Sequence, residues 1–405
     1  MADTTTPNYG LTKPEVGASE DTWGTKINTN LNLIDTQMKV SDDRSATNTT
    51  TANAALPKAG GTMTGNIATA GITSVTLGSG NFVAGSTAGD SIVSGGDNNT
   101  LVGTNAGTAI TTGDRNTALG VDALNDVTTA SYNTAIGTYA GQSITTGATN
   151  TAVGDAALAS TTTASDNTAV GQGSLNANIT GASNTAVGRN ALTTNTTGAY
   201  NTANGFDALK SNTTGTENVA VGQAALNTNT TASNNTAVGA AALYYNTTGA
   251  NNVAVGKSAL VDNTTAANNV AIGYEAGRSI TTSASNVYIG YQAGRSTTTS
   301  YGSNVAIGQN AFYTNTTGYS QTAVGGAALF SNTSGIESTA LGYQALYSNT
   351  TASKNTAVGH YALYYNTTGA NNVAVGASAL LANTTGADNT AVGSGCLDSN
   401  TTGND

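Results

Sequence analysis

A glycine that recurs every 17 residues constrains the fold of this chain more than any other feature. It ends the motif Asn-Thr-Ala-Val-Gly and recurs in eighteen units, with one extra residue before the thirteenth. A unit of this length is too short for a helix pair and too long for a hairpin, so the sequence predicts an all-β parallel β-solenoid, or β-roll, of eighteen coils. These column glycines are Gly103, Gly120, Gly137, Gly154, Gly171, Gly188, Gly205, Gly222, Gly239, Gly256, Gly273, Gly290, Gly308, Gly325, Gly342, Gly359, Gly376 and Gly393.

Positions in a unit are counted from the column glycine, negative before it and positive after it. Position −3 is Thr or Val, and position −1 is Val, Ile or Leu in every unit except that of Asn204. Alternate residues of a strand share one face and β-branched residues suit a pleated sheet, so we expect both positions to face the interior.

Position −2 would then face outward, yet it is Ala in 16 of 18 units, with Leu101 and Tyr288 as the exceptions. A solvent-facing position should vary among polar residues. Uniform Ala therefore predicts close packing of several chains along the rod, and we expect a homotrimer. The alternative is that Ala is simply tolerated on either face.

The remaining positions predict turns around one packed interior. The column glycine indicates a turn with positive φ or with no room for a side chain. Asn at −4, replaced only by Gln321 and Ser338, is expected to stack into an amide ladder. Four units have Gly in place of Leu at +4, and three of these carry Ile at +7, as conservation of core volume requires. The three are Ile110, Ile144 and Ile280.

Composition excludes several classes of function. Only 8% of residues are charged and no basic run occurs, so no nucleic-acid binding is expected. No apolar stretch approaches the roughly 18 to 20 residues that span a bilayer, so no membrane insertion is expected. We predict no catalytic residue, no metal site, no cofactor and no enzymatic activity. The single cysteine, Cys396, and the single histidine, His360, occupy one repeat position each without a partner motif.

The first hundred residues lack the repeat. From Ile27 the apolar residues Ile27, Leu31, Ile34 and Met38 follow heptad spacing, which predicts a short helical coiled coil. The amino terminus has no secretory signal pattern. The predicted organisation is residues 1–26 as an attachment region, 27–56 as a helical coiled-coil stalk, 57–98 as a connector with irregular β-structure, and 99–405 as the solenoid shaft.

Three segments resemble bacteriophage tail fibre proteins. Residues 8–35, which include Tyr-Gly-Leu-Thr-Lys-Pro and Glu-Asp-Thr-Trp-Gly-Thr-Lys-Ile-Asn-Thr-Asn-Leu-Asn-Leu-Ile-Asp, resemble the amino-terminal attachment region of that family. Residues 56–65, Leu-Pro-Lys-Ala-Gly-Gly-Thr-Met-Thr-Gly, resemble a connector of the same proteins. The repeats resemble fibre-shaft repeats that precede an endosialidase-type chaperone, and they are also similar to the head repeats of trimeric autotransporter adhesins.

The resemblance implies a homotrimeric tail fibre of a virion, assembled in the host cytoplasm. Its amino-terminal end would dock on phage tail or baseplate proteins, and its distal end would meet a host-surface glycan or protein, or a capping tip protein. Because the sequence ends in mid-coil, we expect a cleaved carboxy-terminal piece or a cap from another protein. The candidate tail-attachment residues are Tyr9, Leu11, Trp23, Ile27, Leu31 and Ile34.

Tyrosine is unevenly distributed and concentrates in the distal half of the repeats. Exposed tyrosines present rigid amphipathic surfaces, so some are candidate receptor or glycan contacts; the alternative is packing at coil corners. These candidates are Tyr244, Tyr245, Tyr343, Tyr347, Tyr364 and Tyr365.

Three other functions stay open. A cell-surface trimeric adhesin would need a secretion signal and an anchor. A polysaccharide depolymerase would need a carboxylate pair, which no repeat position supplies. A Thr-rich ice-binding solenoid is weakened by the expectation that Thr at −3 faces inward.

Overall fold

The computed structural model describes residues 4–5, 12–13, 32–34, 36–37, 39, 78–298 and 301–404. The chain divides into two units, Met1–Val75 and Thr76–Asp405.

In the first unit, β1 (Thr4–Thr5) pairs antiparallel with β2 (Thr12–Lys13). Residues 32–34, 36–37 and 39 are helical, and the Thr36 hydroxyl donates a hydrogen bond to the Asn32 carbonyl one turn earlier, 2.8 Å away. Ile34 lies on this helix and is 49% exposed. The other predicted coiled-coil and attachment residues lie outside the described residues: Tyr9, Leu11, Trp23, Ile27, Leu31 and Met38.

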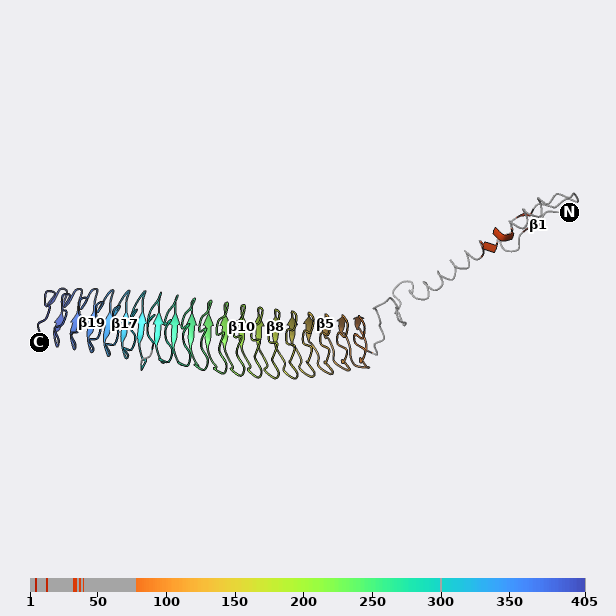
Figure 1. The fold of residues 1–405 in the computed structure, drawn as a ribbon, viewed down its shortest axis with the longest axis horizontal. Coiled ribbons are helices and arrows are strands. Elements are labelled where there is room, and N and C mark those ends of the chain that lie inside the picture. The colour runs from red at the N-terminus through yellow and green to blue at the C-terminus, as the bar shows by residue number, and fades with distance from the viewer. Residues whose placement is uncertain are drawn as a thin grey trace. The chain divides into compact units, whose positions relative to one another are not determined.

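The second unit is a parallel β-solenoid, which confirms the fold predicted from the 17-residue period. Each coil contributes one three-residue strand, and successive strands pair in register, as Thr185 with Thr202. Figure 1 shows the strands side by side in one row. They are β3 (Phe82–Ala84), β4 (Thr100–Val102), β5 (Thr117–Leu119), β6 (Thr134–Ile136), β7 (Thr151–Val153), β8 (Thr168–Val170), β9 (Thr185–Val187), β10 (Thr202–Asn204), β11 (Val219–Val221), β12 (Thr236–Val238), β13 (Val253–Val255), β14 (Val270–Ile272), β15 (Val287–Ile289), β16 (Val305–Ile307), β17 (Thr322–Val324), β18 (Thr339–Leu341), β19 (Thr356–Val358), β20 (Val373–Val375) and β21 (Thr390–Val392).

The sheet begins one coil before the first predicted unit. Strand β3 lies in the segment assigned to the connector, and Phe82 pairs with Thr100. Its coil has the same design, with a column glycine, Gly85, at φ +141° and a buried Ile92 at position +7. The coil was missed because 18 residues, rather than 17, separate Gly85 from Gly103.

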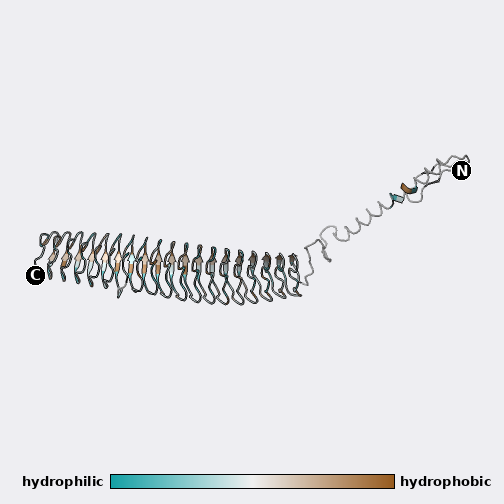
Figure 2. Cartoon of the chain, viewed as in Figure 1, coloured by the Kyte–Doolittle hydropathy of each residue, from teal (hydrophilic) through white to brown (hydrophobic). Residues whose placement is uncertain are grey.

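The two faces of the sheet are the reverse of the predicted ones. Ala186 at −2 is fully buried, whereas Thr185 at −3 is exposed and Val187 at −1 is partly exposed, and the same burial pattern recurs along the sheet. The prediction that −3 and −1 face inward is therefore wrong. Figure 2 shows the hydrophobic colours on the strands and the hydrophilic colours along the turns.

The reason for the reversal is the thinness of the coil. In most coils, Ala at +3 and Leu at +4 are fully buried as well, as at Ala191 and Leu192. The space left between them and the strand admits only a small side chain at −2, because protein interiors are close-packed. Uniform Ala is thus a requirement of the core, and it no longer argues for neighbouring chains.

The two large residues at −2 show that core volume is conserved. Tyr288 is fully buried, and a Cβ added at Gly294 would lie 2.6 Å from its Cδ1 atom. A Cβ added at Gly107 would lie 2.8 Å from both Leu101 Cδ2 and Ile110 Cδ1. Glycine at +4 therefore makes room for a larger side chain from −2 or +7, which confirms the predicted compensation.

The predicted amide ladder is present, and a second one accompanies it. At position −4, the Asn201 side-chain amide donates to Asn184 Oδ1 (3.1 Å) and to the Gly215 carbonyl (2.9 Å). At position +7, Asn212 Nδ2 donates to Asn195 Oδ1 at 2.8 Å and again to the Gly215 carbonyl at 3.0 Å. These amides are buried and hydrogen-bonded, so they stabilise the stack of coils. The second ladder was not predicted from the sequence.

Candidate functional site

The single histidine and the single cysteine of the chain both pack against neighbouring side chains. The exposed His360 ring stacks on Tyr343, with ring centroids 5.6 Å apart. Cys396 is partly buried and packs against the core. Within residues 78–298 and 301–404, no group of three His, Cys, Asp or Glu side chains is placed to hold a metal ion.

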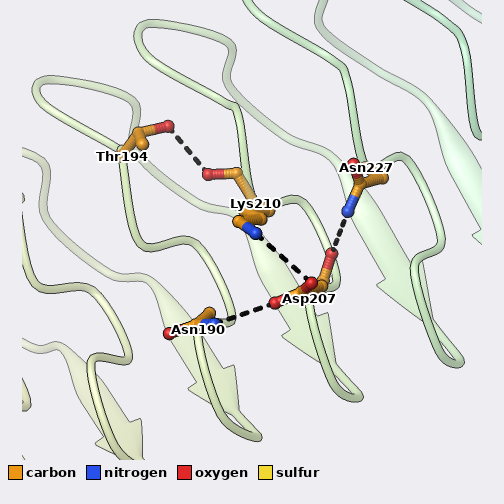
Figure 3. Close-up of polar contacts among 5 residues, drawn as sticks. All are labelled: Asn190, Thr194, Asp207, Lys210 and Asn227. Carbon is orange, nitrogen blue, oxygen red and sulfur yellow. Dashed lines mark hydrogen bonds and ion pairs between the residues drawn. The ribbon is translucent and has the colours of Figure 1, made fainter.

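Side chains at positions +2 and +5 of successive coils lie next to one another, and we call this surface the +2/+5 face. Figure 3 shows it around Asp207 at +2. The Asp207 carboxylate accepts hydrogen bonds from Asn190 (3.0 Å) and Lys210 (3.3 Å), and its backbone carbonyl accepts one from Asn227 (3.0 Å). Three consecutive coils are linked in this way, so these polar groups serve to hold neighbouring coils together.

A second polar cluster on the +2/+5 face centres on Glu275. Its carboxylate accepts hydrogen bonds from Gln292 and Arg295, each 2.8 Å long, and lies 3.6 Å from Arg278. Burial alone would raise the pKa of Glu275, but these hydrogen bonds and the two guanidinium charges together lower it. The carboxylate is therefore held ionised as an ion-pair partner.

In the distal coils the same face carries aromatic rings. At position +5, the rings of four consecutive coils stack nearly parallel, each 5.1 Å from the next, with interplanar angles of 2°, 9° and 5°. We call this stack the aromatic column; its members are Tyr313, Phe330, Tyr347 and Tyr364. The guanidinium of Arg295 lies over the first ring, 5.6 Å from the centroid of Tyr313.

At its distal end the aromatic column opens on a cavity. The cavity has a volume of about 300 Å³ and is lined by Tyr361, Tyr364, Tyr365 and Leu381. The ring of Tyr364 is nearly perpendicular to Tyr361 (88°, centroids 5.3 Å apart) and to Tyr365 (81°, 4.6 Å). Burial, and then the neighbouring phenols, raise the pKa of the Tyr364 hydroxyl above its ordinary value.

The structure gathers four of the six candidate receptor-contact tyrosines near this cavity. Tyr347 and Tyr364 belong to the aromatic column, Tyr365 lines the cavity, and Tyr343 packs edge-on against Tyr361. The other two, Tyr244 and Tyr245, form an edge-to-face pair in a coil seven units earlier.

Sequence reasoning missed Tyr361 and Leu381, which complete the cavity. Aligning position +5 across units would have found the column, because that position holds an aromatic residue in four consecutive coils.

Comparison with known proteins gives no match to this chain among family models, curated proteins or solved structures. None of the helical residues that the structure describes belongs to a segment long and apolar enough to cross a membrane.

Proposed function

We propose that this chain is the shaft of a homotrimeric bacteriophage tail fibre that carries host-surface recognition on a rigid rod. The amino-terminal sequence, with its resemblance to tail-attachment regions, supports docking on the tail or baseplate of the virion. The solenoid supports the mechanical role. Nineteen coils at about 4.8 Å each form a rod of about 90 Å, and every coil is hydrogen-bonded to its neighbours.

The observation that carries the trimer is the outward stripe of position −1. From β4 to β21 this position is Val, Ile or Leu in every strand except that of Asn204, and none of these side chains is buried in the single chain. Some are strongly exposed, including Leu119 (47%), Leu341 (46%) and Val392 (68%). An apolar stripe of this length, interrupted only at Asn204, is typical of a protein–protein contact. Three copies packed around a common axis would cover it on every chain.

The mass of the particle in solution tests this proposal. We expect light scattering to give about three times the chain mass of 39.9 kDa, and negative-stain images to show a thin rod. Aspartate at four stripe positions flanking Asn204, namely Val170, Val187, Val221 and Val238, should bring like charges together at the axis and yield monomers. Asn204 shows that the fold accepts a polar residue in this column.

The matched control places four aspartates in the same coils at position +9, where Thr180, Thr197, Thr231 and Thr248 are exposed. This variant should remain trimeric, and circular dichroism should show that both variants keep their β-structure. A monomeric wild-type chain, or equal dissociation of both variants, would contradict the trimer.

One observation favours a second candidate, ice binding. Seven consecutive strands, β4 to β10, present Thr at −3, and the structure places this column outward rather than inward. A flat column of Thr on a parallel sheet is the surface such a function needs. Thermal hysteresis measured on the wild-type protein decides between the candidates, because a trimer that buries this sheet face should show none.

A further inference from the structure

The cavity at the distal end of the aromatic column is shaped as an open cage. Tyr361, Tyr364 and Tyr365 form three walls, with ring planes 88° and 81° from that of Tyr364, and Leu381 adds an aliphatic wall. Tyr365 is 53% exposed, so the cage is reachable from solvent. The volume of about 300 Å³ accommodates a small organic group.

We propose that this cage binds a quaternary ammonium group, as found in choline and its phosphate esters. Aromatic rings attract a cation over their faces, so a cavity walled by three tyrosines and one aliphatic side chain suits a cation with a methylated, weakly hydrated surface. The proposal names a ligand class for the host-recognition role. It rests on the proposed function only in placing this ligand on a host surface.

The opposite end of the same column already shows the preference for a cation. There the guanidinium of Arg295 lies over Tyr313, 5.6 Å from the ring centroid. The intervening rings stack on one another, so their faces are covered. Tyr364 is the last ring of the stack, and in the next coil position +5 is Leu381, which supplies no charge. The chain therefore provides its own cation at one end of the column and leaves a cavity at the other.

The charge around the cage also favours a cation. No Lys or Arg follows Lys354 in the sequence, whereas Asp388 and Asp398 do. Asp398 occupies position +5 in the coil after Leu381, and its carbonyl accepts a hydrogen bond from the Ala382 amide at 3.0 Å. The main chain of Asp398 thus lies one coil beyond Leu381, and no side chain of Lys or Arg in these last coils competes for the site.

An earlier coil of the chain lacks the cage wall formed by Tyr361 at position +2, and it serves as a natural control. Tyr244 and Tyr245 form the same edge-to-face pair as Tyr364 and Tyr365, with centroids 4.6 Å apart in both cases. In that earlier coil, however, position +2 is Ala241 instead of Tyr. Both Ala241 and Tyr361 have left-handed backbone, with φ of +55° and +58°. In the following coil, Val261 takes the place of Leu381, so an aliphatic wall is present in both sites and the ring at +2 is the aromatic wall that the earlier site lacks.

The test is titration of the full chain with choline chloride, with binding measured by calorimetry and by tyrosine fluorescence. We expect one saturable site per chain in the wild type. Tyr361→Ala and Tyr365→Leu should each weaken binding about tenfold or more, since each removes a cation–π wall. Tyr244→Leu should leave binding unchanged, and Ala241→Tyr should create a second site.

The neutral tert-butyl analogue of choline separates the cation from simple apolar filling. It has nearly the same shape, so equal binding of both compounds would overturn the proposal, as would absence of choline binding by the wild type. Far-UV circular dichroism shows whether each variant keeps its fold, and Ala241→Tyr tests the cage by gain of a site, independently of any loss of stability.

Two sources of the group are distinguished by the probe. Phosphocholine linked to a soluble saccharide represents a surface polymer, and phosphatidylcholine vesicles represent a lipid headgroup; binding of either supports the cage. Light scattering on the same samples reports the trimer separately. Choline binding by a monomer would therefore remove the fibre proposal and keep the cage, and a trimeric rod without choline binding would do the reverse.

Discussion

At the scale of single residues, the column glycines make close backbone contacts between coils. Gly188 has φ +131°, and a Cβ added there would lie 2.6 Å from the Gly205 carbonyl oxygen. Backbone strain and this contact together predict that Gly188→Ala destabilises its coil by about 2–3 kcal/mol. Hydrogen exchange of the peptides that cover this coil and the next, followed by mass spectrometry, measures the loss locally.

The matched control at this scale is Gly173→Ala in the preceding coil. Gly173 has φ +64°, and an added Cβ there would lie 3.2 Å from its nearest neighbour, the side-chain oxygen of Asn190. Ala156 and Ala224 already occupy the equivalent position +2. The control should therefore lose no more than about 1 kcal/mol. An equal loss in both variants would contradict a special requirement for glycine at the column position.

At the scale of one coil, the period and the amide ladder could be read from the sequence, but the inward face could not. Alternation along a strand defines two faces without saying which is buried, and the larger β-branched residues were assigned inward. The decisive signal was present at Leu101 and Tyr288, the large residues at −2, because their units have Gly107 and Gly294 at +4. A volume exchange between −2 and +4 requires that both positions share the core.

The same exchange predicts the behaviour of Tyr288. Tyr288→Ala should destabilise its coil by about 3–5 kcal/mol, because it leaves a cavity over Gly294 and removes the 3.2 Å hydrogen bond to Thr297. Adding Gly294→Leu restores the common Ala and Leu pair of the repeat and should recover most of the loss. Thermal unfolding of the single and double variants measures this. A double variant no more stable than Tyr288→Ala would contradict the shared core.

At the scale of the whole molecule, repetition made the solenoid predictable, whereas the cage depends on how the rings of one coil meet. Tyr361 is at +2 and Tyr364 at +5 of one unit, and their perpendicular contact follows from backbone geometry that the sequence does not express. The attachment residues other than Ile34 lie outside the described residues, so their role stays a prediction. Likewise, Ala at −2 is required by the core, and the exposed apolar stripe at −1 is the feature that supports a trimer.

Because each coil contacts only its neighbours, the length of the shaft should be adjustable in whole units. Deleting residues 154–238 removes five periods of 17 residues and joins Val153 directly to Gly239, so that every column is preserved. We expect a folded trimer about 24 Å shorter, since each coil adds about 4.8 Å, and negative-stain images measure the length.

Deleting residues 154–237 instead leaves one extra residue within a strand, which exchanges the inward and outward faces there. The natural extra residue between Gly290 and Gly308 lies outside β15 and β16 and avoids this exchange. The second deletion should therefore aggregate or lose protection on both sides of the junction, and equal behaviour of the two deletions would contradict a stack held in register by its columns.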